Sequence, residues 1–137
     1  MQRPGRSWLQ RFPVVAASPE SADLPGVLYA GELEIRPDEG LVLANGRALA
    51  LSVREFKLLV AMVRRLGTIT TREELYRTVW GSDLRLGDRS VDVYVSKLRS
   101  KLEATLPDRR FIHTHPGFGY RFQPELSRDV HMEHTGG

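Results

Sequence analysis

An amphipathic helix followed directly by two alternating strands is the feature that most restricts the fold of this chain. Within residues 89–102 one apolar stripe repeats at spacings of four, three and four, and its members are Val91, Val95, Leu98 and Leu102. A stripe with this period is typical of a helix that packs one side on a core. Residues 111–122 then alternate on both sides of Pro116-Gly117, which predicts a β-hairpin beside the helix.

The opposite face of the predicted helix is cationic. At about 100° per residue it presents Arg89, Val93, Ser96, Lys97 and Ser100. Arg and Lys contact phosphates and guanine edges in the major groove of DNA, and an apolar side chain such as Val93 contacts a thymine methyl. The structural alternative is a solvated helix face with one scattered apolar residue. This alternative is stronger for Arg99, because Asp92 lies on the same side and offers an ion pair.

The positive charge of the chain is concentrated in the same segment. Residues 85–121 contain eight Lys or Arg against four Asp or Glu, a balance of +4, whereas the whole chain of 137 residues has a net charge of +3. A positive field over one segment suits a polyanionic partner. No apolar run reaches the roughly 20 residues that span a membrane, so we expect no membrane partner and a cytoplasmic protein.

Two capping boxes predict two helices before this one. In Ser52-Val53-Arg54-Glu55 and in Thr71-Arg72-Glu73-Glu74, a hydroxyl residue precedes a Glu by three positions. Apolar residues follow each box at helical spacing, and Gly67 and Gly81 are expected to end the two helices. Asp88 is expected to cap the third helix.

Residues 27–51 alternate between apolar and polar side chains and contain Asn45-Gly46, which predicts a small antiparallel sheet with a tight hairpin turn. The order of sheet, three helices and hairpin predicts an α+β fold of the winged helix-turn-helix type. We expect a flexible N-terminal arm over 1–26, the winged-helix domain over 27–124 and a flexible tail over 125–137.

Four separated motifs resemble the DNA-binding domain of OmpR/PhoB-type response regulators, in the order found in that family. The resemblance spans about residues 27–123. Its motifs are residues 52–59, 71–75 with 79–81, 88–95 with 97–99, and 117–122.

The resemblance implies a transcription regulator that binds double-stranded DNA. In the family the third helix lies in the major groove, the hairpin wing reaches the minor groove, and dimers occupy direct repeats. The matching helix-contact positions are Arg89, Ser90, Tyr94, Ser96, Lys97 and Arg99. The matching backbone-contact positions are Trp80, Thr114, Gly117 and Tyr120. The loop that can touch RNA polymerase matches Ser82, Asp83, Leu84, Arg85, Leu86 and Gly87.

Two positions depart from the family pattern within the interface. The wing often carries an Arg that enters the minor groove, and Pro116 stands in its place, so His115 or Arg121 is left to replace it. Ser96 stands where relatives often place Arg, which should weaken affinity and lower the salt slope by about one unit.

The residues before the sheet do not form the receiver domain that usually precedes this module. Residues 1–26 contain Glu20 and Asp23 but no βαβ pattern, so we expect no control by phosphorylation within this chain. An alternative function is a protein-binding adaptor, in which the loop 82–87 and residues 8–12 contact polymerase or another regulator and DNA contact is secondary.

The sequence contains no recognisable set of catalytic residues. It has no cysteine, no Gly-rich phosphate loop and no nucleophile elbow, so we expect neither an enzyme nor a cofactor. His113 and His115 alternate on one predicted strand, but no fourth ligand has a fixed spacing to them, so no metal site is expected.

Overall fold

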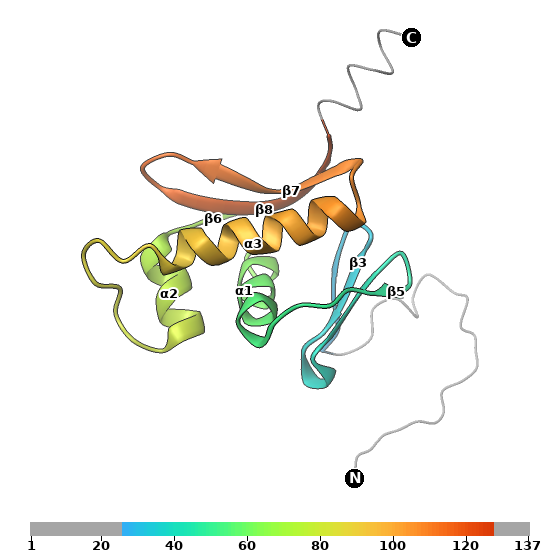
Figure 1. Ribbon diagram of the computed structural model, residues 1–137, viewed down its shortest axis with the longest axis horizontal. Helices are drawn as coiled ribbons and strands as arrows, with labels where there is room; N and C mark the ends of the chain where they lie inside the picture. Colours follow the sequence, from blue (N-terminus) through green and yellow to red (C-terminus); the bar gives the residue numbers. More distant parts are fainter. Residues whose placement is uncertain (1–25, 128–137) are drawn as a thin grey trace, which may run out of the picture.

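The computed structural model describes residues 26–127, and Figure 1 shows an N-terminal sheet at one end, helices in the middle and a hairpin along the last helix. The first sheet contains β2 (Leu28–Ala30), β3 (Leu33–Arg36), β4 (Leu41–Ala44) and β5 (Arg47–Ala48), with the 3-10 turn η2 (Pro37–Glu39) between β3 and β4. The helices are α1 (Val53–Val63), α2 (Arg72–Trp80) and α3 (Ser90–Thr105). The second sheet contains β6 (Ile69–Thr70), β7 (Arg109–His115) and β8 (Gly119–Leu126).

The N-terminal sheet is antiparallel in the order β2-β3-β4-β5, as its alternating sequence predicts. Leu33 and Ile35 of β3 are buried, while the residues between them are partly exposed. Asn45 and Gly46 have φ values of +52° and +80°, the two positive angles that a tight type I′ hairpin turn requires. The predicted hairpin at this position is therefore confirmed. Of the predicted arm, residues 1–25 lie outside the described residues.

Both predicted capping boxes are present. The Ser52 hydroxyl accepts the Glu55 N–H while the Glu55 carboxylate accepts the Ser52 N–H, and Thr71 and Glu74 repeat the arrangement at α2. Helix α2 ends as predicted at Gly81, which has a left-handed conformation. Helix α1 ends at Val63, before the predicted end at Gly67, because the N–H groups of Arg65 and Leu66 donate to carbonyls three residues back instead of four. The Gly67 N–H then donates to the Phe122 carbonyl of β8.

Helix α3 crosses the whole molecule and buries the predicted stripe of Val91, Val95, Leu98 and Leu102. It runs from residue 90 to residue 105, whereas the sequence predicted 89–102. The extension ends just before Pro107, since a residue that precedes proline disfavours the helical conformation.

The start of α3 differs from the prediction in one respect. Arg89 occupies the N-cap position and its side chain makes no capping bond. Asp88, the predicted cap, lies one residue earlier, and its carboxylate accepts the Ser90 N–H at 2.8 Å. The Asp88 side chain therefore satisfies one N–H at the helix start without being the N-cap residue.

The C-terminal sheet has the order β6-β8-β7, so the hairpin is joined to a short strand between α1 and α2 that the sequence did not predict. The joint depends on Gly119, because a Cβ there would lie 2.1 Å from the Thr70 carbonyl oxygen. Strand β8 continues to Leu126, past both the predicted hairpin end at residue 122 and the predicted domain end at residue 124. Residues 128–137 of the predicted tail lie outside the described residues.

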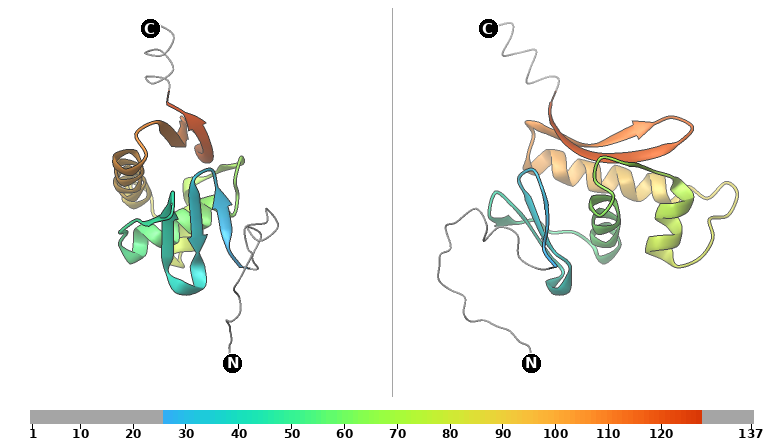
Figure 2. Two further views of the ribbon diagram at one scale, coloured as in Figure 1. Left: turned by 90° about the vertical axis from the view of Figure 1, so that its right-hand side faces the viewer. Right: turned by 180° about the vertical axis from the view of Figure 1, so that it is seen from behind.

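The hairpin tip and the N-terminus of α3 lie at the same end of the molecule. Figure 1 shows both beside the loop between α2 and α3, and the reverse view in Figure 2 agrees. The N-terminal sheet lies at the far end of the structure. The fold therefore presents the start of a long helix, a hairpin tip and a loop on one continuous end.

Candidate nucleic-acid interface

The outward face of α3 is free within the described structure. Ser96, Lys97 and Ser100 are exposed, and Val93 is 46% exposed although its side chain is apolar. Arg89, Val93, Ser96 and Lys97 line a shallow open depression together with Asp92. Four of the residues predicted to contact DNA are thus brought together on one helical surface. The fifth residue of the depression, Asp92, was not predicted as part of the site.

Asp92 connects α3 to α2 and to the hairpin. Its carboxylate accepts hydrogen bonds from Arg72 Nε at 2.8 Å, from Arg89 Nε at 3.2 Å and from the Tyr120 hydroxyl. Burial raises the pKa of Asp92, but the bonds from Tyr120 and Arg72, with the Arg72 charge, outweigh it and leave the pKa below its ordinary value. The carboxylate therefore stays charged and fixes two guanidinium groups at the start of α3.

Tyr120 belongs to this network instead of facing solvent. Its side chain is packed in the core with 5% of the residue exposed. Burial, followed by the bond to Asp92, raises the pKa of its hydroxyl. The sequence placed Tyr120 among the backbone contacts, whereas the structure uses its hydroxyl to hold Asp92.

Trp80 and Tyr94 form an aromatic cluster where α2 meets α3. The Trp80 ring stacks on Tyr76 at 4.8 Å and meets the edge of Tyr94 at 5.7 Å between centroids. Arg54 lies over the Trp80 ring and Lys97 over the Tyr94 ring, at 4.6 and 4.8 Å from the centroids. The Trp80 ring packs on its neighbours and is only half-buried, so a packing role is compatible with the predicted backbone contact.

Arg99 does not pair with Asp92, and that expectation is wrong. One of its terminal nitrogens donates to the Ile112 carbonyl at 3.0 Å and to the Thr114 hydroxyl at 2.9 Å. Seven residues correspond to about 10 Å along a helix axis, which is too far for Asp92 compared with partners on the adjacent strand. Arg99 therefore joins α3 to β7.

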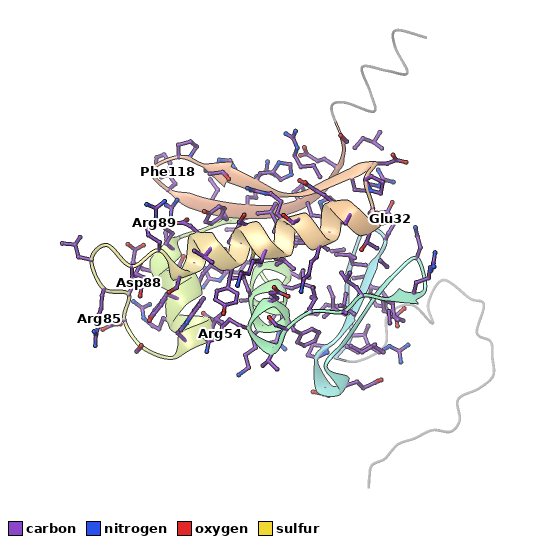
Figure 3. The ribbon with its side chains drawn as sticks, viewed as in Figure 1. Glu32, Arg54, Arg85, Asp88, Arg89 and Phe118 are labelled. Carbon is purple, nitrogen blue, oxygen red and sulfur yellow. The ribbon has the colours of Figure 1, made fainter. Side chains whose placement is uncertain are left out.

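The hairpin tip exposes an aromatic side chain that the sequence did not single out as a site residue. Phe118 is 69% exposed, and Figure 3 places it at the same end as Arg89. Next to it, His115 accepts a hydrogen bond from Arg121 Nε at 3.1 Å, and Gly117 has a left-handed conformation in the turn. The sequence did contain a signal for this residue, because a large apolar side chain directly follows the predicted turn at Pro116-Gly117.

The loop between α2 and α3 is exposed over most of its length. Its members are Ser82, Asp83, Leu84, Arg85, Leu86 and Gly87, and only Leu84 is partly buried. Leu86 is fully exposed, while Asp83 pairs with Arg77 at 3.4 Å. An apolar side chain in full contact with solvent is the most distinctive feature of this loop.

The remaining features of the structure do not involve the predicted site residues. A groove of about 610 Å³ between α1, α2 and η2 is lined by Lys57 among others, and no predicted site residue lines it. Among residues 26–127, no group of three or more metal-ligating side chains comes together. No helix in the same range is long and apolar enough to cross a membrane.

Comparisons with known proteins identify the family. Residues 46–122, more than half of the chain, match the family described as "Transcriptional regulatory protein, C terminal". The chain is 35% identical over 102 residues to the alkaline phosphatase synthesis transcriptional regulatory protein SphR of Synechococcus elongatus, covering 74% of this chain and 40% of that protein. It is 37% identical over 98 residues to the sensory transduction protein RegX3 of Mycobacterium leprae, covering 72% and 50%. The chain thus spans half or less of the length of these relatives.

A solved structure supports the same assignment. The DNA-binding domain of Klebsiella pneumoniae RstA, determined in complex with the RstA box, matches with a TM-score of 0.65 and 33% identity over 72% of this chain and 98% of that one. The chain therefore belongs to the family of C-terminal domains of transcriptional regulatory proteins. The predicted winged helix-turn-helix fold of OmpR/PhoB type is confirmed.

Proposed function

We propose that this member of the transcriptional regulatory family binds double-stranded DNA in a sequence-specific manner and regulates transcription. The observation that carries the proposal is the outward face of α3, which is exposed and cationic while the opposite stripe is buried in the core. The relative RstA was solved with a DNA site, which supports DNA binding here and not the adaptor alternative.

The α3 side chains divide into three roles. Arg89 is 78% exposed at its side chain and Lys97 is also exposed, so both reach phosphates or guanine edges. Val93 lies between them and contacts a thymine methyl in the major groove. Ser90 and Ser96 are short polar groups that hydrogen-bond to bases or to bridging water.

The hairpin contacts the backbone at the adjacent minor groove. Thr114, His115 and Gly117 lie on the distal part of the hairpin, and the turn places Phe118 in solvent beside them. Apolar side chains are used at minor grooves as wedges or as contacts to sugars. Phe118 supplies such a contact where Pro116 replaces the cation that relatives often carry.

Partners beyond DNA follow from the same end of the molecule. The exposed loop 82–87, which includes the fully exposed Leu86, is a surface for RNA polymerase. One module of this size buries a modest area on DNA, so we infer that two copies occupy direct repeats. We propose that the DNA-binding module extends from residue 27 to Leu126, where β8 ends, two residues past the predicted end at 124.

The test is a binding titration followed by anisotropy, using duplexes selected from a random pool, over a series of salt concentrations. We expect Lys97→Gln to weaken binding about fivefold near 0.15 M salt and to lower the salt slope by about 0.9, the effect of one lost phosphate contact. The control is Lys57→Gln, which removes an exposed cation from the groove on α1 and should change neither value. Absence of any salt-dependent complex at micromolar protein would refute the proposal.

A further inference from the structure

Arg99 lies between the outward face of α3 and the hairpin. It lies on the third turn of α3, and its guanidinium donates to the Ile112 carbonyl and to the Thr114 hydroxyl of β7. The Ile112 side chain is buried, so the first acceptor is anchored in the core, whereas Thr114 is exposed close to the hairpin tip. The link therefore runs from the middle of the helix to the distal half of the hairpin.

The chemistry of arginine suits a fixed link. Its guanidinium is planar, and one terminal nitrogen carries two N–H donors at fixed angles, so two acceptors on one strand determine its orientation. Strand β7 is at the edge of its sheet and is held on its other side by β8 alone. Among the described contacts between α3 and the hairpin, the only other polar link is the bond between Asp92 and Tyr120 on β8. Together the two bonds tie each hairpin strand to the helix.

We propose that Arg99 is a positioning residue that sets the distance and angle between α3 and the hairpin and does not contact DNA. This inference rests on the proposed DNA-binding function. By fixing the helix relative to the hairpin, Arg99 determines how far apart the major-groove and minor-groove contacts lie along the duplex. It therefore acts on specificity through spacing, while Lys97 and Arg89 act through contact.

The proposal makes a prediction that depends on the length of the duplex. One duplex carries the full selected site, and a second is truncated on the side where the hairpin contacts the minor groove. Arg99→Gln should weaken binding to the full duplex about tenfold, because the displaced hairpin loses a contact with the DNA backbone. Tenfold is the scale of one lost hydrogen bond to a charged phosphate. On the truncated duplex the same substitution should change binding less than twofold, because the hairpin contact is already absent.

Two further variants keep the test independent of folding problems. Thr114→Val preserves the shape of the side chain but removes the hydroxyl acceptor of Arg99. It should therefore weaken binding to the full duplex and leave binding to the truncated duplex unchanged, as Arg99→Gln does. Arg99→Lys keeps the charge but replaces the planar guanidinium by a freely rotating ammonium, which does not fix the two bonds in one plane, and should behave like Arg99→Gln. Thermal unfolding by circular dichroism should show that the variants fold.

The outcomes separate this inference from the proposed function. An equal loss on both duplexes with Arg99→Gln, rescued by Arg99→Lys, would show direct phosphate contact and overturn the positioning role. A loss of binding to the truncated duplex with Thr114→Val would also overturn it, since the link acts only through the hairpin contact. Failure of the unaltered protein to bind any duplex would instead refute the proposed function itself.

Discussion

Replacement of Asp92 by asparagine tests whether its carboxylate holds the start of α3 to α2 and to the hairpin. The substitution keeps the shape of the side chain but removes the charge that accepts bonds from Arg72, Arg89 and Tyr120. We expect Asp92→Asn to lower the free energy of unfolding by about 2 kcal/mol near pH 7. The melting temperature should fall by roughly 8–16 °C for a domain of about 100 residues.

The magnitude follows from the exposure of the three donors. The Arg89 side chain is mostly exposed, so its ion pair contributes roughly 0.5 kcal/mol or less. The Arg72 side chain is largely screened from water and Tyr120 is buried. Hydrogen bonds to a charged acceptor are stronger than those to a neutral amide by about 1 kcal/mol each, which gives a loss near 2 kcal/mol from these two donors.

The dependence on pH has a definite sign. The pKa of Asp92 in the folded protein is lowered: burial raises it, but the bonds from Tyr120 and Arg72 outweigh burial. A lowered folded-state pKa stabilises the protein fully above the ordinary aspartate pKa of about 4, and this stabilisation is lost as pH falls through the folded-state pKa. The difference between the two proteins should therefore be largest near neutral pH and shrink below about pH 4.

The assay is urea denaturation of the full chain at a series of pH values, followed by circular dichroism. Glu103→Gln is the matched control, because it removes an exposed carboxylate from the same helix and should leave stability unchanged. A difference under about 0.5 kcal/mol for Asp92→Asn near pH 7 would refute the reasoning. A larger difference that stays constant as the pH falls would refute the assigned protonation state.

Two further stability predictions follow from the core. Gly119→Ala should prevent folding or cost more than about 3 kcal/mol of stability, because its Cβ would clash with the Thr70 carbonyl. The control Gly117→Ala should cost about 1 kcal/mol, for its left-handed backbone conformation alone. Equal melting curves for the two variants would contradict this. Glu55→Ala should cost about 2–3 kcal/mol in urea denaturation, because Glu55 is buried, completes a capping box and pairs with Lys101 at 2.6 Å. No loss of stability would contradict the role of this pair.

Features that depend on neighbouring residues could be predicted from the sequence. The capping boxes at Ser52 and Thr71 are formed, because each places its partners three residues apart in a single helical turn. The turn at Asn45-Gly46 is formed because few residues other than Asn and Gly adopt two consecutive positive φ angles. The apolar stripe of α3 is buried as expected, which left its outward face as a candidate site.

Features that depend on residues far apart in the sequence could not be predicted in this way. The partners of Arg99 lie 13 and 15 residues away, and the hydroxyl of Tyr120 meets Asp92 from 28 residues away. Neither separation corresponds to a period of one helix or strand. Strand β6 has two residues, which is too short for alternation to be recognised, and its existence depends on the hydrogen bonds that β8 offers. The sequence analysis therefore named candidate contact residues on the outward face of α3, but not the bonds that hold this helix to the hairpin.

The union of β6 with β8 restricts where this fold tolerates a change in chain length. Gly67 is bonded to β8, and Thr71 caps α2 immediately after β6, so an insertion in this connection would shift the register of the sheet or uncap the helix. The hairpin tip at 116–118 and the loop 82–87 are not fixed in length by a sheet register on one side and a helix cap on the other. Insertions and deletions during divergence should accordingly accumulate at the hairpin tip and in the loop 82–87, while the connection between α1 and α2 keeps a constant number of residues.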